Sequence, residues 1–595
     1  MKNILYCNIE KRFVQLINHG RGEFLMDFRV QKRTAQLLYH LLTQQNEEAA
    51  QIPFTPAKRV WSGDFQESSP LARASARSQG VSNGYLQRFF REMSPLHPHS
   101  VLVLRHGYVI GEMDYPPFSA KEWHVTHSLC KSLTAMAIGL LIDEEKLSLT
   151  DKIADFFPEY TPSRRVAGIT VYQLLTMTSG VVYNEAASIT EENWVKGFLE
   201  SSVRGEGFQY NSMNTYMLAV IACRVSGQSL SDFLREKLLE PMGIRRFYWE
   251  CCPLGIEKGG WGLYMLPEDM AKLGQLLLQK GCWEGQQRIS KEWVEQATSK
   301  QVETPEESSS YGYGFQIWMG PDAGSYQFSG MLGQNVMVFP RTDMVVVNTA
   351  GNMALEARNA LAAVIEKYFG DGFEPGTELD EGAEFLVPRG IIHRRRREVR
   401  PPKGTLLNTD LVTGLGLLCG RSFVADGSGT AILPVFMQAV QNNFSKGISR
   451  ISFCQQDDMF CGMFRCGDEE ITLQIGLGQA RKQKIRLRGE YYQLALQGEF
   501  TQNEDHVLVF KLRICFLEYS NERIIKIYPQ PGGIYTSWLE VPGPEMIVDA
   551  LDVVSGTAGS LMSSLLSRVD PGFFVYRLQK TMERKMFYRL ESPLG

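Results

Sequence analysis

The stretch THSLCKSLTAMAIGLLI, residues 126–142, places a serine and a lysine directly before a long apolar run. Ser128 and Lys131 are three positions apart, so on a helix their side chains share one face, with Cβ atoms about 5–6 Å apart. A serine hydroxyl is a weak nucleophile unless a neighbouring base takes its proton, and a desolvated lysine can be that base. The pattern therefore predicts a nucleophilic Ser128 with Lys131 as its base. The alternative is an ordinary helix start, because two fixed positions carry little information.

A second polar group of residues precedes the apolar helix expected within GFQYNSMNTYMLAVIACRVSG, residues 207–227. Tyr210 and Ser212 lie in this polar turn. A tyrosine beside a charged lysine loses its proton more easily, so Tyr210 is a candidate general base shared with Lys131. The alternative is a core tyrosine whose hydroxyl is satisfied by a hydrogen bond.

A third candidate segment is FSGMLGQNVMVFP, residues 328–340. Its small residues, Ser329 and Gly330, allow a strand edge to approach a substrate closely. The backbone N–H of Met331 is then a candidate oxyanion donor beside the N–H of Ser128. The alternative is a glycine bulge on an edge strand.

Residues 75–372 alternate helix and strand patterns. SVLVLRHGYVIGEM, residues 100–113, is typical of a β-hairpin with a His-Gly turn. Strand patterns return in residues 326–350, and helical patterns lie between the two. This order predicts an α+β domain whose antiparallel sheet is assembled from both ends of the segment and flanked by helices.

The rest of the chain divides into three predicted parts. We expect an N-terminal helical appendage over 1–74 and a linker over 373–403. The arginine run in IIHRRRREVRPPK fits a solvated linker, with a polyanion-binding patch as the alternative. Alternating strand patterns with Gly, Asp and Asn turns predict a mainly-β domain over 404–595, a barrel or a sandwich, with a helical tail.

The composition limits the possible functions. A net charge of −4 argues against a general nucleic-acid binder. The 11 cysteines are an odd number without C-x-x-C spacing, which favours reduced thiols and a cytoplasmic protein. The sequence offers no signal-peptide pattern and no apolar run of about 18 residues, so we expect no membrane span. It also lacks the common metal and nucleotide motifs, so we expect no metal or cofactor.

Several blocks of the sequence resemble the serine β-lactamase-related superfamily. This family includes class C β-lactamases, D-alanyl-D-alanine peptidases, and ester and amide hydrolases such as the 6-aminohexanoate-dimer type. The resemblance spans residues 75–370. The blocks that carry it are residues 101–160 around THSLCKSL, ITVYQLLTMTSG at 169–180, FQYNSMNTY at 208–216, WGLYMLPEDMAKLGQLLLQKG at 261–281, YGYGFQIW at 311–318 and SGMLGQNVMVFPRTDMVVVNTAG at 329–351.

The resemblance implies a role for each of the matching residues. Ser128 is implied as the nucleophile and Lys131 as its base partner. Tyr210 is implied as a second base and leaving-group acid. Ser212 stands where many members have Asn, a residue that positions the lysine and the substrate. The implied oxyanion hole consists of the N–H groups of Ser128 and Met331. The implied fold is a helical subdomain on a five-stranded antiparallel sheet flanked by helices.

The third motif departs from the family pattern. Members usually have Lys or His, then Thr or Ser, then Gly, whereas this chain has Phe328, Ser329 and Gly330. A phenylalanine cannot bind the carboxylate of a penicillin or of a peptidoglycan stem. The departure argues against β-lactamase and peptidase activity and favours a neutral or apolar ester or amide.

Other residues near these motifs have mainly structural interpretations. His124 and His127 lie close to Ser128, but a histidine at the start of a helix is more often structural than catalytic. Cys130 points away from the face of Ser128 and Lys131 and is expected to be buried. Three aromatic residues are candidates for lining an apolar pocket, with core packing as the alternative: Trp261, Tyr313 and Trp318.

Together these patterns predict a serine hydrolase that cleaves an ester or amide bond of a small molecule through a Ser128 acyl-enzyme. An acyltransferase needs the same catalytic atoms and is one alternative. A catalytically silent ligand-binding or sensing protein is the other. A homo-oligomer is possible, and the C-terminal domain could cap the site, form a dimer surface or bind a polymeric substrate.

Overall fold

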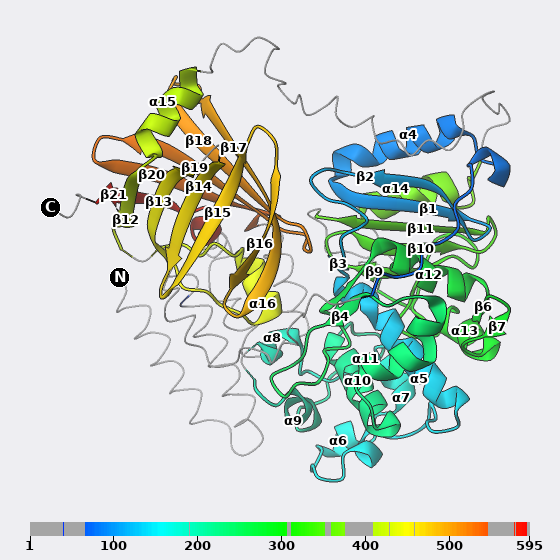
Figure 1. Ribbon diagram of the computed structural model, residues 1–595. Helices are drawn as coiled ribbons and strands as arrows, with labels where there is room; N and C mark the ends of the chain where they lie inside the picture. Colours follow the sequence, from blue (N-terminus) through cyan, green and yellow to red (C-terminus); the bar gives the residue numbers. More distant parts are fainter. Residues whose placement is uncertain are drawn as a thin grey trace.

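The computed structural model in Figure 1 shows an α+β part beside a β-barrel. This arrangement confirms the predicted fold class. The structure describes residues 40, 66–189, 191–305, 311–351, 359–374, 409–427, 429–456, 459–544, 576 and 579–591.

The α+β part is built on a six-stranded antiparallel sheet with the order β2-β1-β11-β10-β9-β8. The hairpin β1–β2 pairs through β1 with β11, so both ends of the segment meet in one sheet as predicted. The sheet has one strand more than the five implied by the resemblance, because two-residue β8 adds to its edge. The strands are β1 Pro98–Arg105, β2 Tyr108–Asp114, β8 Trp318–Met319, β9 Tyr326–Gly330, β10 Gln334–Phe339 and β11 Met344–Ala350.

Both faces of this sheet are covered by helices, as Figure 1 shows. Along β1, Val101 and Val103 join the core under α4 (Asn83–Met93) and α14 (Ala360–Phe369), while the alternate residues join the other core. The alternation follows from the period of two along a strand. The other face packs on α12 Pro267–Leu278 and α5 Lys131–Asp143.

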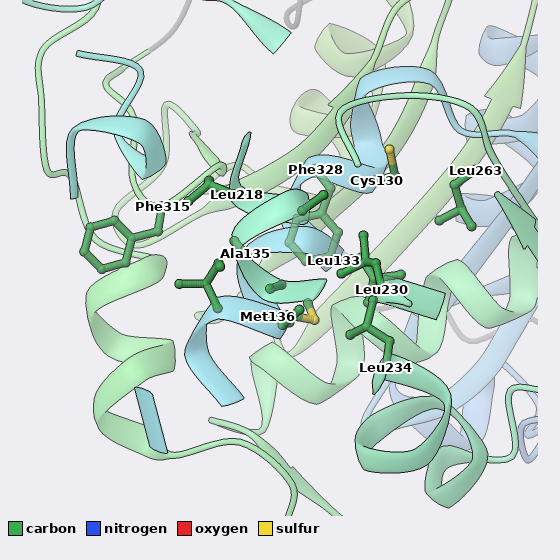
Figure 2. Close-up of a cluster of buried hydrophobic side chains, with 14 of the residues drawn as sticks. Cys130, Leu133, Ala135, Met136, Leu218, Leu230, Leu234, Leu263, Phe315 and Phe328 are labelled. Atoms are coloured by element: carbon green, nitrogen blue, oxygen red, sulfur yellow. The ribbon is translucent and has the colours of Figure 1, made fainter. Parts of the chain in front are cut away.

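Helix α5 is the centre of the helical subdomain. Every residue from Lys131 to Leu141 is buried. Figure 2 shows Leu133 and Met136 of this helix among leucines of α10 and α11. The apolar run that follows Ser128 in the sequence is therefore enclosed on all sides. The other helices are α6 Arg164–Ala167, α7 Val171–Leu175, α8 Glu185–Ser188, α9 Trp194–Leu199, α10 Ser212–Ser226, α11 Leu230–Leu234 and α13 Lys291–Ala297.

Short strands complete the α+β part. The three-stranded sheet β3-β5-β4 lies beside the start of α5. Its strand β3 ends at Val125, two residues before the turn His127–Cys130 that leads into α5. The short strands are β3 His124–Val125, β4 Phe247–Trp249, β5 Leu263–Met265, β6 Cys282–Trp283 and β7 Gln286–Gln287.

The C-terminal strands form a barrel rather than a sandwich. Nine strands pair in a ring that closes where β15 pairs with β17, and β16 pairs with β17 outside the ring. The interior is filled by side chains that include Phe500 and Phe510, whose ring centroids are 4.6 Å apart. Closure removes the free edges of the nine-stranded ring, and β16 remains an edge strand outside it. The elements are α15 Thr409–Leu418, β12 Arg421–Ala425, α16 Val435–Gln441, β13 Ile448–Gln456, β14 Met459–Cys466, β15 Glu469–Leu477, β16 Arg481–Leu487, β17 Glu490–Gln502, β18 Leu508–Phe516, β19 Glu522–Gln530, β20 Gly533–Val541 and β21 Lys585–Leu590.

The turn between β18 and β19 joins the barrel to the α+β part. The indole N–H of Trp123 donates to the carboxyl of Glu518, and the backbone N–H of Val125 donates to the Glu518 carbonyl at 2.8 Å. The hydroxyls of Tyr264 and Tyr519 are 2.6 Å apart. These contacts involve β3 and β5, the strands that precede and flank the start of α5. The barrel is therefore anchored next to the S-x-x-K segment.

Much of the predicted appendage, linker and tail lies outside the described residues: 1–39, 41–65, 375–408 and 545–575. The described end of the appendage is not helical, since Arg73 forms a parallel bridge with Val109 of β2. Within the part that the structure describes, no helix has both the length and the apolar character needed to cross a membrane.

We expect Glu518→Gln to stabilise the protein at alkaline pH. Burial raises the pKa of Glu518 to about 7, above the 4.5 of an exposed carboxyl. The free energy of unfolding of the wild type therefore falls as the pH rises from about 5 through 7. The full shift in pKa corresponds to a loss on the order of 3 kcal/mol. Glutamine keeps an acceptor for Trp123 without a charge. Urea unfolding should show a higher midpoint for the variant than for the wild type at pH 8.5 and similar midpoints at pH 5.

The control is Glu499→Gln, a change at an exposed carboxyl of the same barrel. It should leave the midpoint unchanged at both pH values. A Glu518→Gln variant that is less stable than the wild type at pH 8.5 would contradict this account of the Glu518 carboxyl.

Candidate functional site

Ser128 and Lys131 meet as the sequence pattern predicts. The Lys131 Nζ donates to Ser128 Oγ at 2.7 Å and to the carbonyl of Gly260 at 2.8 Å. The predicted helix start differs in detail, because Ser128 lies in a 3-10 turn, His127–Cys130, and α5 begins at Lys131. The tight turn still brings the two side chains together at the N-terminal end of the buried helix.

Lys131 is 1% exposed, so its amino group is almost fully removed from water. Burying a charged amine costs several kcal/mol unless polar groups surround it. Here the partners are Ser128 Oγ, the Gly260 carbonyl and the face of the Tyr210 ring, whose centroid is 4.9 Å from Nζ. The serine hydroxyl is therefore bonded to a desolvated amine, the arrangement that proton transfer from the hydroxyl requires.

Tyr210 lies in an aromatic cluster. Its ring stacks on Trp318 at 5.4 Å between centroids and meets Tyr313 edge-on at 6.5 Å. Phe208 packs against the same two residues. The structure thus brings Tyr210 to Lys131 as expected, with the ring face as the contact. It also places Tyr313 and Trp318 beside the site, whereas Trp261 stacks on Trp194.

Ser212 packs against Gly260, and the carbonyl of Gly260 accepts a hydrogen bond from Lys131. Ser212 is the first residue of α10, after the cap Asn211, and its N–H donates to the carboxylate of Glu185 at 2.6 Å. A Cβ added to Gly260 would lie 2.8 Å from the Ser212 carbonyl oxygen. The close packing of these two residues holds the Gly260 carbonyl in position for Lys131.

Strand β9 brings the third motif against the nucleophile turn. A Cβ added to Gly330 would lie 2.2 Å from the carbonyl oxygen of Thr126, so this position has no room for a side chain. Met331 follows Gly330 directly in the chain, so the residue with the candidate oxyanion N–H adjoins this close contact. The Ser329 hydroxyl donates to Asn335 Oδ1 on the paired strand at 3.3 Å.

Phe328 points away from the site. Its side chain is 1% exposed and belongs to the core around α5, beside Leu133 in Figure 2. The first position of the third motif is therefore part of the hydrophobic core in this chain.

The two histidines near Ser128 have different environments. His124 Nε2 is 2.9 Å from His99 Nδ1, its Nδ1 is 2.9 Å from the Val125 carbonyl, and burial lowers the pKa of His124 to about 4. This environment matches the structural interpretation. His127 is also buried, which lowers its pKa to about 3, but neither ring nitrogen has a hydrogen-bond partner among the described residues.

The motifs did not reveal the loop 257–261. Gly259 and Gly260 allow this loop to approach α10, and the Gly259 carbonyl accepts hydrogen bonds from Cys130 and Thr134. Cys130 is buried, as expected. The adjacent glycines are the one signal in the sequence that could have indicated this close approach.

A buried ion pair lies beyond this loop. Lys258 Nζ is 2.8 Å from Glu250 Oε2, and both side chains are at most 3% exposed. Glu250 also accepts from Tyr264, which contacts Tyr519 of the barrel. Separate stretches of sequence supply these groups, and no local pattern connects them.

Residues 88–366 match the family model described as Beta-lactamase. The match supports the assignment of this part of the chain to the serine β-lactamase-related superfamily. Among curated relatives, the superfamily member 6-aminohexanoate-dimer hydrolase of Paenarthrobacter ureafaciens is 29% identical over 280 residues. The alignment covers 41% of this chain and 70% of that protein.

Two similar solved structures cover different shares of the chain. The crystal structure of a family VIII carboxylesterase is 16% identical, covers 51% of this chain and 99% of its own, and has a TM-score of 0.42. The octameric penicillin-binding protein homologue from Pyrococcus abyssi is 16% identical, covers 74% of this chain and 97% of its own, and has a TM-score of 0.39. Membership of the superfamily supports serine-hydrolase chemistry of the esterase or amidase type through an acyl-enzyme.

We expect Gly330→Ala to impair the site. The new methyl group would collide with the Thr126 carbonyl and push β9 away from the nucleophile turn. A displacement of about 1 Å can cost on the order of a hundredfold in rate. The measurement is the rate at which a fluorophosphonate probe labels Ser128.

Gly416→Ala is the matched control, because a Cβ at this exposed helical glycine meets nothing within 4 Å. It should label at the wild-type rate. A Gly330→Ala variant that folds and labels at the wild-type rate would show that the close contact with Thr126 is not needed.

Proposed function

We propose that this protein is a serine hydrolase that cleaves an ester or amide bond of a small molecule through an acyl-enzyme on Ser128. The observation that carries the proposal is the 2.7 Å hydrogen bond between Ser128 Oγ and the buried Lys131 Nζ. A serine on a solvent-exposed helix start would have no such partner.

In the acylation step, Ser128 Oγ attacks the substrate carbonyl carbon while Lys131 takes the hydroxyl proton. The carbonyl oxygen becomes an oxyanion and is held by the backbone N–H groups of Ser128 and Met331. The bond to the leaving group then breaks, and the leaving group departs with a proton. A water molecule attacks the acyl-enzyme in the same way, and Ser128 recovers its proton.

Tyr210 is the proposed donor of the leaving-group proton. Its ring lies against Lys131, so proton exchange between the two residues needs only a small rotation or one water molecule. Ser212 is proposed to position the lysine through Gly260, whose carbonyl contacts Lys131. In this scheme Ser329 and Gly330 shape the strand edge that lies along the substrate.

The proposed substrate is neutral or apolar near the scissile bond. Phe328 is buried in the core and offers no cation for a carboxylate. The aromatic cluster of Phe208, Tyr210, Tyr313 and Trp318 provides an apolar wall on the Tyr210 side. Both features argue against a penicillin. They fit the ester and amide classes, the latter being the class that the name of the 6-aminohexanoate-dimer relative suggests.

The decisive experiment is intact-mass analysis after treatment with a fluorophosphonate probe. We expect one adduct on the wild type and none on Ser128→Ala. Lys131→Met and Tyr210→Phe should react more slowly, both in probe labelling and in ester turnover. For Lys131→Met the rate should fall by about a hundredfold or more.

Ser132→Ala is the matched control, since this neighbouring buried serine donates to the Gln316 carbonyl and has no role in the proposed reaction. It should give the wild-type adduct. A folded wild type that forms no adduct would reject the hydrolase and favour a ligand-binding protein that uses the same site.

A further inference from the structure

A short helix of the C-terminal domain, α16, reaches the residues around Ser128. The Phe436 ring centroid is 6.4 Å from that of His127, the residue directly before the nucleophile. Phe436 also forms a buried cluster with Leu332, against which Met331 and Val440 pack. A side chain from the barrel domain therefore lies beside His127, the neighbour of Ser128, and beside Met331, the second proposed oxyanion residue.

The other end of α16 contacts the loop that carries Gly260 and the end of α8. The Val440 carbonyl accepts a hydrogen bond from Lys258 at 3.2 Å. Asn442 donates to the carbonyls of Ser188 and Ile189, both at 3.3 Å, at the end of α8. Figure 1 shows α16 lying next to α8. The helix thus bridges the turn after β9 and the segment after α8.

The barrel holds α16 in place. The Val435 N–H donates to the Glu540 carboxylate, which forms a fully buried ion pair with Arg523. At its C-terminal end, Gln441 bonds the hydroxyls of Tyr519 and Tyr492. A side chain on such a firmly held helix can act as a fixed wall of a binding site.

The position of Phe436 suggests which part of a substrate it meets. Two separate apolar clusters lie around Ser128: one contains Tyr210 and Trp318, and the other contains Phe436 and Leu332. The leaving group must lie on the Tyr210 side, where it receives its proton. The acyl group then extends toward the cluster that contains Phe436.

His127 gives a second indication that a ligand binds on this side. It is 2% exposed, and neither of its ring nitrogens bonds to a described residue. A buried polar group without a partner is unfavourable, so such groups commonly meet a ligand or water. This imidazole belongs to the residue directly before Ser128 and lies beside the Phe436 ring.

We propose that Phe436 is a specificity-determining residue that closes the acyl subsite and restricts the enzyme to short acyl groups. This inference rests on the proposed function. It gives the C-terminal barrel a direct part in the active site, because the wall that limits the substrate comes from the barrel domain.

The test measures kcat/KM for p-nitrophenyl acetate, butyrate and octanoate, which share one leaving group and differ in the acyl chain. The wild type should prefer acetate and butyrate. In Phe436→Ala the octanoate-to-butyrate ratio should rise on the order of tenfold, because several methylenes gain room. Phe436→Trp should lower the butyrate-to-acetate ratio. Val435→Ala, on the same helix, is the matched control and should keep the wild-type ratios.

Fluorophosphonate labelling of Ser128 and thermal unfolding accompany each variant. If both Phe436 variants are folded and labelled, yet change all three esters equally, Phe436 has only a structural role and the inference is wrong. If Phe436→Ala does not fold, Phe436→Leu and Phe436→Trp decide the question by the same ratios. If the wild type is neither labelled nor active on any ester, the proposed function fails and the inference falls with it.

Discussion

The buried amino group of Lys131 is the constraint on which the site depends. An amine that is 1% exposed needs polar partners on every side. Ser128 and Gly260 supply oxygens, and Tyr210 supplies a ring face. Each partner comes from a different element, so the requirement fixes the nucleophile turn, the glycine loop and the start of α10 relative to one another. The apolar surroundings of α5 make the requirement strict, because the side chains that enclose this helix offer the amine few other polar partners.

Residues with a left-handed backbone conformation flank the proposed oxyanion donors. His127 has φ 48° and Leu332 has φ 64°, and these residues flank the two proposed oxyanion donors. Met177 and Gln316 also have positive φ. The Gln316 side chain forms hydrogen bonds with carbonyls of α7 and with a hydroxyl of α10. Non-glycine residues in this region cost about 1 kcal/mol or more each and persist where surrounding packing holds them. Such strain is typical of segments that aim backbone N–H groups at a reacting atom.

The two parts of the molecule share buried polar contacts, which explains why the barrel can contribute to the site. The Glu250–Lys258 pair is bonded to Tyr264 on one side and to the Val440 carbonyl on the other. Buried polar groups hold their partners in one geometry, because breaking a contact leaves an unsatisfied group in a medium of low dielectric. The position of α16 is therefore determined by the same network that lies behind the Lys131 loop.

The sequence by itself determined the α+β class, the strand-rich C-terminal domain and the Ser128–Lys131 contact, because periods of two and of 3.6 residues and a spacing of three act locally. It also predicted Tyr210 as a candidate base, whose ring lies against Lys131, and a strand edge at Gly330, where β9 ends. Only the tertiary structure decided that Gly260 bonds Lys131, that Phe328 is buried, that the C-terminal strands close into a barrel, and that Phe436 lies beside His127. These contacts join segments that are distant in the chain, and side-chain packing, rather than any local pattern, brings them together.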